Sequence, residues 1–183
     1  MTEEQGSWVN RLRRREPQAL RAFVSDHGEA VRRYLLGIVR SPADAEELAQ
    51  DALVRFLGAL DGFRGDASPK TFLFRIAHNL AVNHVKSASR RYETTLDALL
   101  EIPGPGGETH DHLESTERSQ RLREALQHLP LRQRTVVVLK TWEDMTFREI
   151  SEVLELAEGT VKAHYFFGLR GLRKLLEDSR DTR

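Results

Sequence analysis

Residues 44–91 read DAEELAQDALVRFLGALDGFRGDASPKTFLFRIAHNLAVNHVKSASRR and contain two helical patterns of opposite charge on either side of a short loop. In the first pattern, apolar residues recur at steps of three and four, which predicts a helix with one apolar stripe. The stripe comprises Ala45, Leu48, Ala49, Ala52, Leu53, Phe56, Leu57 and Leu60. The opposite face carries Glu46, Glu47, Gln50, Asp51 and Val54. This helix is therefore expected to present an acidic outer surface.

The second pattern follows a loop at residues 62–69 and predicts a basic helix over residues 70–91. Its apolar side comprises Phe72, Leu73, Ile76, Ala77, Leu80 and Val85. Its remaining surface carries Lys70, Arg75, Lys86, Arg90 and Arg91 together with Asn79, Asn83 and His84. The sequence thus places an acidic helix and a basic helix next to each other around one loop.

Two further helical patterns precede this pair, at residues 7–15 and 18–40. Pro17 separates them, because proline is accepted at a helix start and disrupts a helix interior. Ser41 is a candidate N-cap for the acidic helix, and Asp44 in its first turn suits the positive end of the helix dipole. No stretch alternates apolar and polar residues as a strand would. We therefore predict an all-α fold.

The helical period returns at residue 121 and predicts four more helices. Thr146 and Glu149 form a capping-box pattern that opens the third of these. Residues 156–159, with a glycine at the end, are expected to form a tight turn before a last helix at residues 160–176. The helix before the turn is acidic, whereas the last one carries Lys162, Arg170, Arg173 and Lys174 without an acidic residue. This arrangement predicts a helix-turn-helix with a cationic second helix, as nucleic-acid binding requires.

Residues 93–118 are rich in proline, glycine and acidic side chains, which is typical of a flexible linker. We therefore expect two small helical domains, at residues 1–92 and 119–183, joined by a flexible acidic linker. The pair His110 and His112 in this segment is too small a ligand set to predict a metal site.

Charge is distributed unevenly along the chain, although the 28 basic and 28 acidic residues balance. Residues 41–61 hold one basic and five acidic residues, a net charge of −4, whereas residues 62–92 hold six and one, a net charge of +5. A net charge of zero is thus compatible with an acidic surface that faces a protein partner and a basic surface that faces nucleic acid.

The chain has no cysteine, which excludes disulfides and thiolate metal sites. It has no apolar run long enough for a membrane span and no signal-peptide pattern, so we expect a cytoplasmic protein without membrane insertion.

The strings DAEELAQDALVRFL and FRGDASPKTFLFRIAHNLAVNHVKSASRR, followed by the C-terminal helix-turn-helix, resemble the extracytoplasmic-function (group IV) sigma factors of bacterial RNA polymerase. The resemblance covers residues 20–91 and 122–176. It implies a factor that binds core RNA polymerase and directs promoter-specific initiation of transcription, with a stress or envelope-response regulon as the expected target. The implied partners are core polymerase and promoter DNA, with an anti-sigma factor as a further partner common in the family. No cofactor, catalytic residue or small-molecule substrate is implied.

The resemblance also assigns roles to individual residues. The polymerase-binding surface comprises Glu47, Gln50, Asp51 and Val54. The minus-ten surface, which captures a flipped base and reads the element, comprises Phe63, Arg64, Asp66, Ser68, Asn79, Asn83, His84, Lys86, Arg90 and Arg91. The minus-thirty-five surface comprises Thr160, Lys162, Ala163, His164, Phe166, Phe167 and Arg170.

The chain departs from the family pattern at the last helix, where His164 and Phe167 replace frequent arginines. Phe72 stands where tryptophan is usual, and Asn83 where aspartate is common. An exposed phenylalanine can pack against a thymine methyl group. We therefore predict a minus-thirty-five element with a thymine facing Phe166 or Phe167. The alternative is that both rings pack into the core of their own domain.

Two other classes of protein were compatible with parts of the sequence. The GTVKAH string at residues 159–164 also resembles the DNA-binding domain of LuxR-type regulators, which makes a helix-turn-helix activator the alternative function. Such a regulator would need alternating strands and helices upstream, and none is predicted. An enzyme is disfavoured, because no phosphate loop, metal-ligand cluster or pair of nucleophile and base is present.

Overall fold

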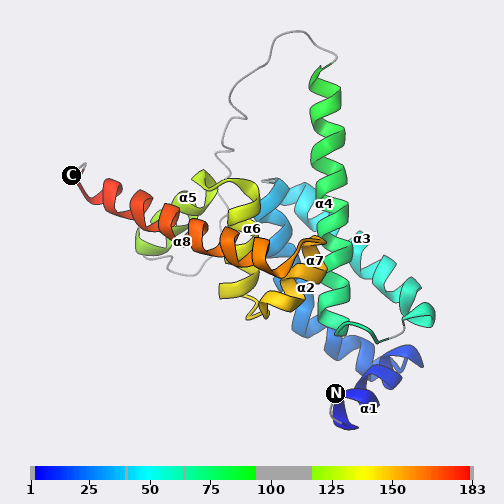
Figure 1. Ribbon diagram of the computed structural model, residues 1–183. Coiled ribbons are helices and arrows are strands. Elements are labelled where there is room, and N and C mark those ends of the chain that lie inside the picture. The colour runs from blue at the N-terminus through cyan, green and yellow to red at the C-terminus, as the bar shows by residue number, and fades with distance from the viewer. Residues whose placement is uncertain (1–2, 40, 64, 94–116, 182–183) are drawn as a thin grey trace. The chain divides into compact units, whose positions relative to one another are not determined.

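The computed structural model describes residues 3–39, 41–63, 65–93 and 117–181, and all of its regular elements are helices (Figure 1). The all-α prediction is confirmed. The chain divides into two compact units, Met1–Gly107 and Glu108–Arg183. Most of the predicted linker, and with it the histidine pair, lies outside the described residues. The predicted domain limits therefore stay predictions.

The first unit contains four α-helices and one short 3₁₀-helix. They are α1 (Glu3–Arg13), α2 (Pro17–Val39), α3 (Pro42–Ala59), η1 (Leu60–Gly62) and α4 (Pro69–Glu93). The predicted N-cap of α3 is confirmed, since the backbone N–H of Asp44 donates to Ser41 Oγ over 3.3 Å. Helices α2, α3 and α4 each begin with a proline. The first residue of a helix does not donate a helical hydrogen bond, so the missing N–H of proline has no cost there.

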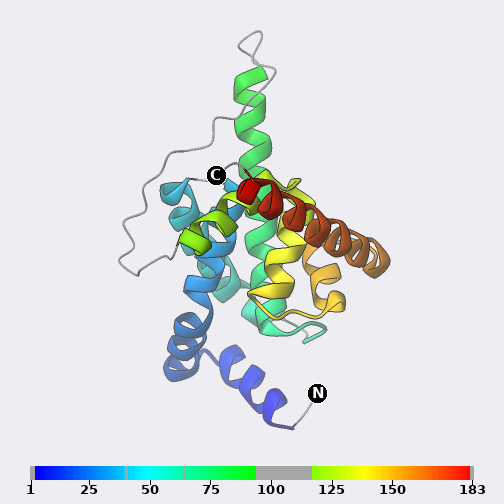
Figure 2. The ribbon, with the colours of Figure 1, turned by 90° about the vertical axis from the view of Figure 1, so that its left-hand side faces the viewer.

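Helices α2, α3 and α4 pack against one another and enclose the core of the first unit (Figures 1 and 2). The centre of this core is an aromatic stack. Phe23 of α2 lies on Phe56 of α3 with ring centroids 4.6 Å apart, and Phe56 lies 5.9 Å from Phe72 of α4. Phe72 in turn stacks on Phe63, which precedes the loop, at 5.1 Å. One continuous stack thus ties three helices to the start of the loop.

More of the helix α4 surface is buried than its apolar pattern predicted. Leu73, Ala77 and Leu80 are buried as expected, but Phe74 and Ala81 are buried as well. The cause is that α4 contacts both α2 and α3, so two of its faces are covered.

The second unit contains α5 (Glu117–His128), α6 (Leu131–Thr141), α7 (Phe147–Leu154) and α8 (Glu158–Asp181). Helix α8 packs against each of the other three. The buried cluster Leu126, Leu129 and Val137 is covered by Leu122, Tyr165, Leu172 and Leu175. Gly168 is also buried and lets α8 approach α6 closely. This packing places Tyr165, Gly168 and Leu172 on the inner side of α8.

The turn between α7 and α8 differs from the prediction. The capping box is present, with Glu149 N–H donating to Thr146 Oγ1 over 3.2 Å and Thr146 N–H donating to Glu149 Oε2 over 2.8 Å. However, the left-handed residue that ends α7 is Glu155, with φ 53°, and α8 already begins at Glu158. The predicted turn glycine, Gly159, therefore lies within the first turn of α8.

In the part of the chain that the structure describes, no helix is long and apolar enough to cross a membrane.

Candidate functional site

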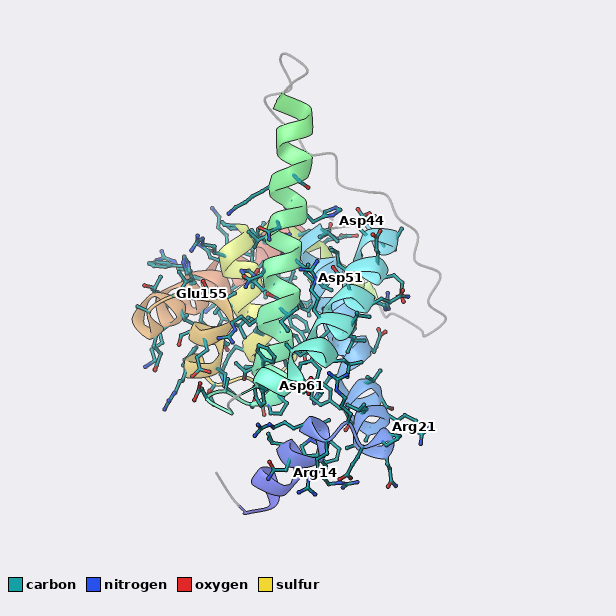
Figure 3. All side chains as sticks on the ribbon, turned by 90° about the vertical axis from the view of Figure 1, so that its right-hand side faces the viewer. Arg14, Arg21, Asp44, Asp51, Asp61 and Glu155 are labelled. Atoms are coloured by element: carbon teal, nitrogen blue, oxygen red, sulfur yellow. The ribbon has the colours of Figure 1, made fainter. Side chains whose placement is uncertain are left out.

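The acidic face of α3 projects away from the core, as predicted. Glu47, Gln50 and Val54 are exposed, and Val54 exposes 67% of its surface. Asp51 lies on the same face, where its Oδ1 accepts a hydrogen bond from Arg55 Nε over 2.9 Å (Figure 3). Arg55 was not among the predicted site residues, although its place four residues after Asp51 is typical of a helical ion pair. The surface is thus acidic and polar around one exposed apolar residue.

The loop between η1 and α4 shows two departures from the predicted roles. Phe63 was predicted to contact DNA, but it is only 7% exposed because it stacks on Phe72. Ser68 is exposed, but its hydroxyl caps α4 by accepting from the N–H of Thr71 over 3.0 Å. Phe63 therefore supports the loop from within, whereas Ser68 caps α4 at the surface. Asp66 is exposed, whereas Arg64 lies outside the described residues.

Helix α4 exposes a polar stripe beyond the loop. Asn79, Asn83 and Lys86 are exposed at spacings of four and three residues, which puts them on one face. His84 is only half-buried, and its Nε2 lies 3.3 Å from Asp44 Oδ2 at the start of α3. The backbone of Arg90 and Arg91 belongs to α4, while their side chains lie outside the described part.

Helix α8 exposes nearly all of the residues predicted to read DNA. Thr160, Lys162, Ala163, Phe166, Phe167 and Arg170 are exposed, and His164 is half-buried. Phe166 exposes 63% and Phe167 51% of their surface, and their rings meet edge to face at 5.6 Å. This exposure excludes the alternative that both rings pack into the domain core. Leu169, which the sequence analysis did not select, is 41% exposed on the same helix.

The exposed end of α8 is held by contacts to α7. Phe147, at the start of α7, meets Tyr165 edge to face with ring centroids 5.5 Å apart. Lys162 Nζ lies 2.6 Å from Glu158 Oε1 and 5.8 Å from the Phe147 ring. One of the few cations on this face is therefore partly neutralised by its own helix, whereas Arg170 has no ion-pair partner among the described residues.

The described residues hold no group of three or more histidine, cysteine, aspartate or glutamate side chains that could bind a metal ion. The candidate surfaces are polar, charged and aromatic faces of helices.

Comparison with known proteins finds two family matches in order along the chain. Sigma-70 region 2 matches residues 23–91, and Sigma-70, region 4 matches residues 119–172. The first match spans α2 to α4, and the second spans the helix-turn-helix. A LuxR-type activator is not favoured, because the first half of the chain is a sigma-factor region and shows no strand in its described residues.

Whole-chain relatives agree with these matches. The chain is 32% identical to the RNA polymerase sigma-E factor of Streptomyces avermitilis, over 87% of this chain and 85% of that protein. It is 28% identical to the ECF RNA polymerase sigma factor SigW of Bacillus subtilis, over 93% of this chain and 95% of that protein. The structure of the sigma factor RpoE from Bartonella quintana, in complex with the anti-sigma factor NepR, has a similar fold. Its TM-score is 0.71 at 20% identity, over 86% of this chain and 96% of that chain. The chain belongs to the sigma-70 family, in its extracytoplasmic-function group, and directs RNA polymerase to specific promoters.

Proposed function

We propose that this sigma factor docks on core RNA polymerase through the exposed face of α3 and contacts promoter DNA through α4 and α8. The observation that carries the proposal is the order of the two sigma-70 regions, because the first contains the exposed faces of α3 and α4 and the second contains that of α8. The protein then acts by binding, without a catalytic step of its own, in the cytoplasm where the polymerase works.

The α3 face suits a protein partner. Val54 is an apolar side chain exposed to 67%, surrounded by Glu47, Gln50 and Asp51. An apolar centre with a charged rim is the arrangement found in specific protein interfaces. The acidic rim would favour a basic surface on the polymerase.

The loop and α4 suit a separated DNA strand. The aromatic stack fixes the start of the loop, and Gly65 takes a left-handed conformation with φ 80°. The loop therefore offers backbone groups at low steric cost. Asn79, Asn83 and Lys86 continue from the loop along one face of α4, where they can hold bases and phosphates of the same strand.

The exposed face of α8 is suited to bind duplex DNA through apolar contacts with the bases. Phe166 and Phe167 are the most exposed large hydrophobic residues of this helix, and a thymine methyl group is the apolar feature of the major groove. We propose that a thymine of the minus-thirty-five element faces one of these rings, while Lys162 and Arg170 contact the backbone.

We also propose that an anti-sigma factor binds this protein and inhibits it. The similar RpoE structure is a complex with an anti-sigma factor, which supports a partner of that kind here. A stress or envelope-response regulon would fit control of this type.

Run-off transcription tests the proposed function. Core polymerase is assayed on a library of genomic promoters with and without this chain, and transcripts are expected only when the chain is present. The roles of single residues are tested by Asn79→Ala and Lys86→Ala, with Arg33→Ala on the exposed surface of α2 as control. Permanganate reactivity at the start site should fall for the two α4 variants, while the footprint on closed duplex is largely kept. Equal loss of both signals would contradict a role in melting.

A further inference from the structure

The end of α1 carries a dense group of positive charges that the proposed function does not use. Residues 11–15 contain four arginines, Arg11, Arg13, Arg14 and Arg15, and no acidic residue. Two of the four are paired. Arg11 Nε lies 2.8 Å from Glu16 Oε2, and Arg15 Nη2 lies 3.0 Å from Asp61 Oδ2 of η1.

The other two arginines line a surface hollow. Asn10, Arg13, Arg14 and Asp61 surround this hollow, which has a volume of about 290 Å³. Arg13 and Arg14 are exposed, and neither has an ion-pair partner in the described part of the chain. Because Asp61 is paired with Arg15, the hollow keeps a positive charge that no ion pair among the described residues neutralises.

The hollow lies next to the proposed base-capture loop. Helix α1 contacts η1, and η1 ends one residue before Phe63, where the loop starts. Figure 3 shows Arg14, which follows α1, below Asp61 of η1, and Figure 1 shows α1 near the end at which α4 begins. The Arg15–Asp61 ion pair joins the residues just after α1 to η1. Asp61 thus holds α1 in place, and the free arginines lie close to the start of the loop.

We propose that Asn10, Arg13 and Arg14 bind backbone phosphates of the separated promoter strand whose base is held by the loop. Guanidinium groups bind phosphate oxygens through two parallel hydrogen bonds, and an asparagine amide can donate a third. A strand that enters the loop must carry its neighbouring phosphates across the adjoining surface, and this is where the unpaired arginines lie. The inference rests on the proposed role of the loop and α4, and it extends the DNA surface onto α1.

The salt dependence of binding provides the test. Holoenzyme assembled from core polymerase and this chain is titrated with a fluorescent fork DNA whose non-template strand is single-stranded from the minus-ten element onward. The double variant Arg13→Ala/Arg14→Ala should bind more weakly at low salt. Two lost phosphate contacts on a single strand should lower the slope of log K against log salt concentration by about 1.4, at roughly 0.7 for each contact.

Two controls define the result. Arg33→Ala removes an exposed arginine of α2 and should keep the parental slope, and Arg13→Lys/Arg14→Lys should restore most of it because charge is retained. An unchanged slope in Arg13→Ala/Arg14→Ala, with parental binding intact, would overturn this inference alone. Loss of binding to core polymerase by that variant would also overturn it, since the arginines would then contact protein. If parental holoenzyme fails to bind the fork, the proposed function itself is wrong.

Discussion

Replacing Gly168 by alanine should destabilise the second unit, although alanine is the better helix former. A Cβ atom at this position would lie 2.7 Å from Val137 Cγ2 and 3.3 Å from the backbone oxygen of Gln133. Val137 is buried and belongs to the core cluster, so it has little room to move. Overpacking of this kind costs about 1–3 kcal/mol. The higher helix propensity of alanine offsets up to about 1 kcal/mol of this cost, which leaves a net loss of up to roughly 2 kcal/mol.

The same helix provides matched controls. A Cβ at Gly159 would meet nothing within 4 Å, so Gly159→Ala should be neutral or stabilising by up to about 1 kcal/mol. At Gly171 the new Cβ would meet only Leu129 Cδ2, at 2.8 Å, which is the end of a flexible side chain. Gly171→Ala should therefore rank between the other two. Because Gly168 and Gly171 both lie inside α8, the difference between their variants measures the steric cost without the helix preference.

Thermal unfolding of the full chain, with hydrogen exchange of α6 and α8 amides, would provide the measurement. A difference of 1 kcal/mol shifts the midpoint of a domain of this size by about 4–8 °C. Gly168→Ala should unfold at a lower temperature than Gly159→Ala by at least the lower figure, with faster exchange confined to the second unit. Equal stability of the two variants would refute the close approach of α8 and α6.

Four further predictions concern individual side chains. Asp51→Lys should abolish pull-down of core polymerase while costing about 0.5 kcal/mol of stability, since it removes one exposed helical ion pair; unchanged pull-down would contradict the docking surface. Phe167→Arg should change the preferred minus-thirty-five bases and steepen the salt slope of duplex binding by about 0.9, whereas an unchanged promoter preference would refute apolar reading. Glu155→Asn should raise the urea midpoint, with a gain of up to about 1 kcal/mol, because asparagine tolerates the left-handed backbone better than glutamate does. Burial raises the pKa of Tyr34 above its ordinary value of 10.0, so only the unfolded state ionises as pH rises past 10, and stability falls there. Tyr34→Phe should lose about 1 kcal/mol at neutral pH with the hydrogen bond to His78, and should lack that alkaline loss.

Local signals in the sequence predicted the helices well. The Ser41 cap and the Thr146 capping box depend on residues three apart, and both form as expected. Amphipathic spacing likewise placed Glu47 and Gln50 on the outer face of α3, where both are exposed. Such features depend on residues that lie within one or two helical turns of each other in the sequence, and hydrophobic periodicity reports on this range.

Features that depend on tertiary contacts could not be read in this way. Periodicity does not show that Arg134 and Thr135 are buried in α6, where Arg134 donates to the carbonyl of Gln127 over 3.2 Å. The burial of Phe63 depends on Phe72, which approaches it only when α4 folds back on α3. The left-handed residue is Glu155, where α7 ends, whereas Gly159 lies inside α8, and the local sequence alone did not distinguish these two positions. The exposure of most of the predicted site residues was therefore predictable, whereas the supporting contacts beneath them were not.

The aromatic stack from Phe23 to Phe63 bears on which mutations are expected to impair promoter opening. Its first ring lies in α2, whereas its last ring stands at the entrance of the loop, and each ring rests on the next. A screen for promoter-opening defects should therefore recover substitutions at Phe23 and Phe56, which touch no DNA. Second-site suppressors of such alleles should map to neighbouring members of the stack, since a smaller ring at one position is compensated by a larger one at the next.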